Sequence, residues 1–144
     1  MSTTFSRTIT NELHSLESLM HAITNFLEDN GVDAQAVYRI NLAMEEMVTN
    51  VIKYGYTDYE THDIDITVDI REEQIVAVIE DRGKPFNPLE AKPAPEPGSV
   101  EESQVGGLGI HLIRKMLDTL DYRRDAGKNV LEIRARRNAP ATGA

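Results

Sequence analysis

The segment DIDITVDI at residues 63–70 alternates strictly between polar and apolar side chains. A period of two predicts a strand with one face buried and the other in water. The next apolar run, IVAVIE at 75–80, follows a short polar turn and is apolar on both faces. Together the two segments predict an antiparallel hairpin whose second strand lies in the centre of a sheet.

Around this hairpin, the apolar pattern predicts helices in blocks rather than in alternation with strands. We expect a strand, two helices, the hairpin, a third helix and two closing strands, at 3–9, 11–30, 33–54, 63–70, 75–80, 107–120, 121–124 and 129–136. Asn11 and Asp33 are candidate N-caps, and Gly31 and Gly55 follow the first two helices. This order predicts an α+β fold, a two-layer α/β sandwich with a mixed, mostly antiparallel sheet and helices on one face.

The composition excludes several kinds of site. The chain has 144 residues, 40% of them hydrophobic, which suits one domain, and it has no cysteine, so disulfides, zinc ribbons and thiol nucleophiles are excluded. A net charge of −9 argues against direct nucleic-acid binding. No apolar run approaches the ~20 residues that span a bilayer, so we expect a cytoplasmic protein without a membrane partner.

Glu46 and Asn50 are the first candidates for a functional site. They are four residues apart and therefore share one face of the second helix, with Lys53 one turn beyond Asn50. An amide oxygen suits Mg²⁺, and a carboxylate can accept a proton from a hydroxyl nucleophile. Taken alone, the same residues also fit a solvated helix face.

Two further segments contain residues suited to a nucleotide. Asp81-Arg82-Gly83-Lys84-Pro85-Phe86 ends the apolar strand, where an aspartate can accept a hydrogen bond from an exocyclic amine such as that of adenine. Gly106-Gly107-Leu108-Gly109 stands where a helix begins, and free N–H groups there can bind phosphate. Taken alone, these segments also fit a polar turn and a hinge with a helix cap. Between them the periodicity is lost and prolines gather, which is typical of a functional lid or a disordered insertion.

The order of the three segments resembles that of the Bergerat-fold, or histidine-kinase-like, ATPases. NLAMEEMVTNVIKYGY resembles their N-box, DRGKPFNP their Asp-x-Gly adenine box, and VGGLGIHLIRKMLD their second glycine box. In detail the motifs are similar to those of the bacterial anti-sigma factor serine/threonine kinases. The resemblance covers roughly residues 5–136.

The resemblance implies an ATP-binding domain at 1–137, with an ATP lid at 82–105 and a flexible tail at 138–144. It implies that Glu46 is the catalytic base and Asn50 the Mg²⁺ ligand. Glu45 is an alternative base in sequence alone, but helical phase turns it about 100° away from Asn50. The other ATP-binding residues it implies are Lys53, Asp81 on the adenine amine, Gly83, Pro85, Phe86, Gly106, Gly107, Leu108 and Gly109.

The resemblance also implies a function. The chain would bind Mg-ATP and phosphorylate a serine on a small STAS-type antagonist of an anti-sigma factor, controlling sigma factor availability, and it would form a homodimer. The alternative is a nucleotide-dependent protein-binding switch without useful catalysis, although retention of both Glu46 and Asn50 argues against it. Histidine phosphorylation in trans and a metabolic ATPase fit less well, since the sequence shows no acceptor or second domain.

Overall fold

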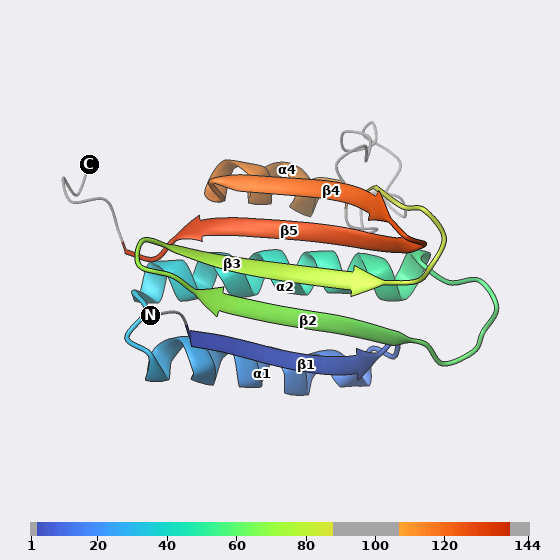
Figure 1. The fold of residues 1–144 in the computed structure, drawn as a ribbon, viewed down its shortest axis with the longest axis horizontal. Coiled ribbons are helices and arrows are strands. Elements are labelled where there is room, and N and C mark those ends of the chain that lie inside the picture. The colour runs from blue at the N-terminus through green and yellow to red at the C-terminus, as the bar shows by residue number, and fades with distance from the viewer. Residues whose placement is uncertain (1–2, 88–106, 139–144) are drawn as a thin grey trace.

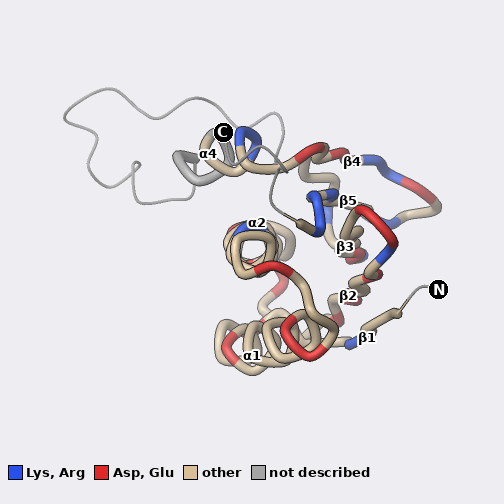
Figure 2. Tube along the Cα trace, turned by 90° about the vertical axis from the view of Figure 1, so that its left-hand side faces the viewer, with Lys and Arg blue, Asp and Glu red and all other residues tan. Residues whose placement is uncertain are grey.

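The structure is a computed structural model that describes residues 3–87 and 107–138. Its elements are β1 (Thr3–Thr10), α1 (His14–Asp29), α2 (Ala34–Tyr54), β2 (Asp63–Ile70), β3 (Gln74–Asp81), α4 (Gly107–Met116), β4 (Thr119–Asp125) and β5 (Lys128–Arg136). The strands form one five-stranded sheet in the order β1-β2-β3-β5-β4, with every neighbouring pair antiparallel. The helices lie side by side on one face of this sheet (Figure 1; Figure 2, seen along the sheet), so the predicted α+β sandwich is confirmed.

The predicted hairpin is confirmed as β2 and β3, paired from Ile64 with Asp81 to Ile70 with Ile75. β3 lies between β2 and β5, which explains why it is apolar on both faces. In β2 the apolar residues face the helices and are buried, while the aspartates lie on the other face. Two of these aspartates accept hydrogen bonds from threonines of the edge strand β1, at 2.6 Å for Asp65 and 3.1 Å for Asp69.

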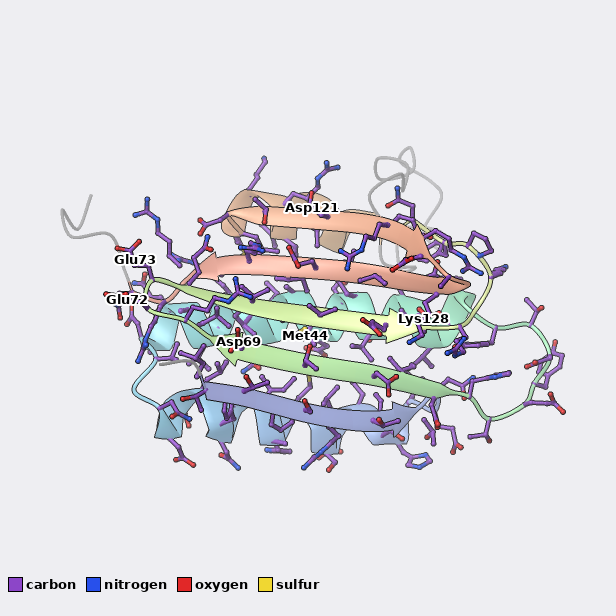
Figure 3. All side chains as sticks on the ribbon, viewed as in Figure 1. Met44, Asp69, Glu72, Glu73, Asp121 and Lys128 are labelled. Carbon is purple, nitrogen blue, oxygen red and sulfur yellow. The ribbon has the colours of Figure 1, made fainter. Side chains whose placement is uncertain are left out.

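The face of the sheet away from the helices carries charged residues. Figure 3 shows Asp69, Asp121 and Lys128 on this face. Lys128 Nζ lies 3.6 Å from Glu80 Oε2, a cross-strand ion pair between β5 and β3. The core is therefore confined to the layer between the sheet and the helices.

α2 lies at the centre of that core, in contact with α1 on one side and α4 on the other. Its stripe at Ile40, Met44 and Met47 is almost completely buried, and Met44 lies between α2 and the sheet (Figure 3). Full burial of one such side chain contributes about 1.5–3 kcal/mol. This packing fixes the position of the polar residues along the edges of α2.

α1 begins at His14, so the prediction that Asn11 caps it is wrong. Asn11 instead extends the pairing of β1 with the segment before β2. Its backbone N–H donates to the His62 carbonyl, and its side-chain Oδ1 accepts from the His62 backbone N–H at 2.8 Å. The end of α1 is as predicted. Gly31 has a φ of +74°, and Val32 N–H reaches back to the Leu27 carbonyl at 3.1 Å.

α4 ends at Met116, earlier than its apolar pattern predicts. Asp118 N–H donates to the Arg134 carbonyl, and Thr119 and Leu120 already pair with β5, so Leu120 belongs to the sheet. The turn at Ala126-Gly127 is confirmed, with φ values of +50° and +81°. Most of the predicted lid at 82–105, and all but Asn138 of the tail, lie outside the described residues. None of the described helices is long and apolar enough to cross a bilayer.

Candidate functional site

A pocket opens between α2 and the ends of β3 and β5. It holds about 340 Å³ of empty space, counted out to its open mouth. It is lined by Met47, Val51, Gly55, Ile79, Asp81, Phe86, Tyr122, Asn129 and Leu131. The walls are mainly apolar, and the few polar groups come from Asp81, Tyr122 and Asn129. Such a lining suits a flat, largely apolar ligand that carries a hydrogen-bonding edge.

Asp81 is the charged group of this pocket, and only 4% of it is exposed. Its Oδ1 accepts two hydrogen bonds, from Gly83 N–H at 2.8 Å and from Asn129 Nδ2 at 3.0 Å. Within residues 3–87 and 107–138 no donor bonds to Oδ2. A carboxylate oxygen can accept a hydrogen bond from a ligand, and an exocyclic amine is a suitable donor.

Gly83 is required by a backbone contact that the sequence alone does not reveal. A Cβ atom at this position would lie 2.4 Å from the Gly55 carbonyl oxygen and 2.9 Å from Asp81 Oδ1. The same Gly55 oxygen accepts the N–H of Lys84 at 3.0 Å. The turn after β3 is therefore docked directly on the C-terminal end of α2, which closes one side of the pocket.

Asn129 is a functional residue that the sequence analysis missed. It lies opposite Asp81 in the β3–β5 register and is 5% exposed. Its Nδ2 donates to Asp81 Oδ1 and to the Lys84 carbonyl at 2.9 Å. Its Oδ1 accepts from the Tyr122 hydroxyl, from Arg124 Nη1 at 3.1 Å and from the Phe86 N–H at 3.4 Å. The one sequence signal is a polar residue at the start of an apolar strand, which a turn explains equally well.

Arg124 was also missed, and it adds a second clamp on the same turn. Its Nη1 donates to the Gly83 carbonyl at 2.8 Å as well as to Asn129 Oδ1. Both residues come from the β4–β5 hairpin, which is 40 or more residues away from the turn in sequence. Long-range contacts of this kind hold the Asp81–Phe86 turn in place.

Glu46 and Asn50 lie beside the pocket, on the adjoining edge of α2. Asn50 Nδ2 donates to Glu46 Oε2 at 3.3 Å, as their i,i+4 spacing predicts, and Asn50 is 4% exposed. Glu46 is half-buried, whereas Glu45 is exposed. Burial raises the pKa of Glu46, and this effect outweighs the hydrogen bond from Asn50 and the charge of Lys53, which lower it. A raised pKa makes this carboxylate a stronger proton acceptor near neutral pH.

The remaining predicted residues lie in several places. Phe86 lies in the pocket, and its ring centroid is 6.0 Å from that of Tyr54, whereas Pro85 and Lys53 are exposed. Gly107 and Gly109 lie in the first turn of α4, which packs against α2. Gly106 and the side chain of Leu108 are outside the described part of the chain.

The donor set fits a magnesium–nucleotide ligand. Asn50 and Glu46 offer amide and carboxylate oxygens, the hard ligands that Mg²⁺ prefers. Asp81 offers an acceptor for an amine deep in an apolar pocket, and the start of α4 offers backbone N–H groups. Asn50 is the residue that would hold the metal.

Comparison with known proteins shows the family of the chain. The sequence profile of the family described as "Histidine kinase-like ATPase domain" matches residues 9–135. The chain belongs to this family. It is 28% identical over 105 residues to the serine-protein kinase RsbW of Oceanobacillus iheyensis, covering 70% of this chain and 66% of that protein. It is 26% identical over 100 residues to the serine/threonine-protein kinase BtrW of Bordetella bronchiseptica, covering 69% of this chain and 70% of that protein.

A solved structure shows the same fold. The RsbU and RsbW domains of Rv1364c from Mycobacterium tuberculosis superpose with a TM-score of 0.70 at 16% sequence identity. The superposition covers 96% of this chain and 34% of the solved chain, so this chain corresponds to about a third of that two-domain structure. The predicted membership of the histidine-kinase-like ATPases is thus confirmed.

Proposed function

We propose that this member of the family is a regulatory serine/threonine protein kinase that binds Mg-ATP and phosphorylates a small antagonist protein. The observation that carries the proposal is the paired Glu46 and Asn50 beside a pocket whose one carboxylate, Asp81, has an oxygen without a donor among the described residues. An adenine acceptor, a metal ligand and a base then lie along one helix and the strand next to it. The names of the relatives from Oceanobacillus and Bordetella support the same activity.

Each residue has a separate role in this proposal. Asp81 accepts the adenine amine on Oδ2, while Asn129 and Gly83 hold its other oxygen. Asn50 binds the Mg²⁺ that neutralises the phosphates, and Gly107 and Gly109 bring backbone N–H groups toward them. Bound Mg-ATP supplies the phosphoryl group, and its transfer to a serine hydroxyl releases ADP and one proton. Glu46 accepts that proton, which its raised pKa favours.

The partner follows from the resemblance to anti-sigma factor kinases. We propose a STAS-type antagonist as the phosphorylated protein and a sigma factor as the competing partner, with the chain acting as a homodimer. We propose also that 82–105 acts as the ATP lid, that the domain extends over 1–137, and that Lys53, Pro85, Phe86, Gly106 and Leu108 contribute to ATP binding.

The test is the Glu46→Gln variant, which keeps the size and hydrogen-bonding capacity of the side chain. We expect it to bind ATP with wild-type affinity and to lose phosphoryl transfer by a factor of about 10²–10⁴, the usual contribution of a general base. The assay is transfer of labelled phosphate to purified STAS-type proteins of the source organism, followed by mapping of the phosphorylated residue. Glu45→Gln is the matched control, because Glu45 is exposed and makes no hydrogen bond among the described residues.

The outcome also separates the two candidate functions. If Glu46→Gln transfers the phosphoryl group at the wild-type rate, Glu46 is not the general base. Nucleotide-dependent complex formation without any phosphorylated product, in the wild type as in the variant, supports the protein-binding switch instead of the kinase.

A further inference from the structure

A second hollow lies between α1 and α2, formed by residues that play no part in the nucleotide site. It holds about 830 Å³ of empty space, counted out to its open mouth. Its apolar side chains are Leu13, Leu16 and Met20, and its polar ones include Glu17, Asn41 and Glu45. The two helices run next to each other there (Figure 2), so the hollow is a groove along the helical layer.

The apolar side chains of the groove form a stripe of their own. The core-facing stripe of α1 is Leu19, Ile23 and Leu27, all of them completely buried. Leu16 and Met20 are only half-buried, and Leu13 is 54% exposed. From Leu13 to Thr24 the groove spans twelve residues, about 16 Å or three helical turns. It thus offers an extended apolar floor that residues 3–87 and 107–138 leave uncovered.

The formal charge at the rim is acidic. Glu17 and Glu45 flank the floor, one on each helix, and the described residues that line the groove include no lysine or arginine; His21, whose Nε2 lies 4.0 Å from Glu17, is the histidine among them. Opposite charge on a partner steers its approach and fixes its orientation. A partner with basic side chains on either side of an apolar stripe matches this surface.

Asn41 gives an independent indication that a donor is required in the groove. Its Nδ2 donates to Thr24 Oγ1 at 2.6 Å and links α2 to α1. Its Oδ1 is buried and accepts no hydrogen bond from any described residue. Buried acceptors are nearly always paired, because leaving one unpaired is unfavourable. Once the Asn41 side chain turns this buried oxygen toward the groove, a lysine, arginine or amide donor there would satisfy it.

We propose that the α1–α2 groove is a docking site for a basic amphipathic helix of a partner protein. The apolar stripe of the partner lies on Leu13, Leu16 and Met20. Its basic side chains meet Glu17 and Glu45, and one donor reaches Asn41 Oδ1. The occupant that fits is a helix. The side-chain rows of α1 and α2 border the groove, and a third helix can pack between them as ridges pack into grooves. The proposal does not rest on the proposed kinase activity.

The test uses a synthetic, end-capped peptide of about 16 residues, with leucine at i, i+3, i+4 and i+7 spacing and lysine on both flanks. Its binding to the full chain is measured by calorimetry and by amide chemical shifts. We expect the shift changes to centre on residues 13–24 and 41–45. A peptide with glutamate in place of lysine should not bind.

Two variants distinguish docking in the groove from general attraction of a cationic peptide to an acidic protein. Glu45→Lys should weaken binding about fivefold or more, whereas Glu28→Lys, an exposed charge reversal elsewhere on α1, should weaken it by less than about twofold. Asn41→Leu should weaken binding, because it removes the acceptor for the partner's donor, and the melting temperature measures separately the cost of losing the bond to Thr24. Equal effects of the two lysine variants, unchanged affinity in Asn41→Leu, or shift changes centred outside the groove overturn the proposal.

Discussion

Asn129 offers the sharpest test of how the proposed nucleotide pocket is held together. The Asn129→Ala variant removes five hydrogen bonds at once, to Asp81, Lys84, Phe86, Tyr122 and Arg124. Three of them join β5 to Asp81 at the end of β3 or to the turn after it. The other two, from Tyr122 and Arg124, lie within the β4–β5 hairpin. The substitution leaves the apolar walls of the pocket in place, so it isolates the polar clamp.

The expected loss in the free energy of unfolding depends on which of the five partners water can reach after the substitution. The bond to Asp81 is buried, so its loss leaves one oxygen with a single donor at a cost of about 1–3 kcal/mol. The other four bonds are partly exposed, and water replaces much of each. We expect a total loss of about 3 kcal/mol in the free energy of unfolding, which lowers the melting temperature by about 10 °C.

Urea unfolding and titration with a fluorescent ATP analogue measure the two consequences. Because Asp81 loses a donor that orients it, we expect affinity for the analogue to fall about tenfold or more, which corresponds to at least about 1.4 kcal/mol. Asn25→Ala is the control, since Asn25 is an exposed asparagine on α1. If Asn129→Ala unfolds within about 0.5 kcal/mol of the wild type and keeps full affinity, the clamp is not what positions Asp81.

Two further predictions concern the turn after β3 and the edge of the sheet. Gly83→Ala places a methyl group 2.4 Å from the Gly55 oxygen, so we expect nucleotide binding to be lost while circular dichroism still reports a folded sheet; retained affinity would contradict this contact. The hydrogen bond from Arg71, and then that from Thr4, lower the pKa of Asp69. A carboxylate with a lowered pKa stabilises the fold at pH values above its unfolded-state pKa, and this stabilisation is lost as pH falls through the folded-state pKa. In Arg71→Ala the free energy of unfolding in urea should therefore fall less steeply between about pH 5 and pH 2 than in the wild type.

The fold was predictable because each of its elements is specified locally. The alternation of 63–70 fixes which face of β2 is buried, and the apolar β3 can only lie inside a sheet. The errors occur where a distant partner overrides the local pattern. Asn11 has the chemistry of an N-cap, but it bonds to His62, and Leu120 continues a helical stripe, but it pairs with Ile133.

The candidate site was predictable in the parts that lie on one element. Glu46 and Asn50 meet because four residues along a helix bring side chains together, and Asp81 is marked by its place at the end of an apolar strand. Asn129 and Arg124 were not predictable in the same way. Their role arises from the pairing of β5 with β3, a contact that periodicity does not specify.

α2 shows how one helix can serve two surfaces. Glu45 and Glu46 are adjacent in sequence, yet about 100° of helical rotation places Glu45 with Asn41 at the α1–α2 groove and Glu46 with Asn50 at the nucleotide pocket. Between them the buried stripe of Met44, Met47 and Val48 is fixed against the sheet, so the two edges cannot shift independently. A charge reversal at Glu45 should therefore change peptide binding without moving Asn50, whereas a change in the packing of Met47 should disturb both surfaces together.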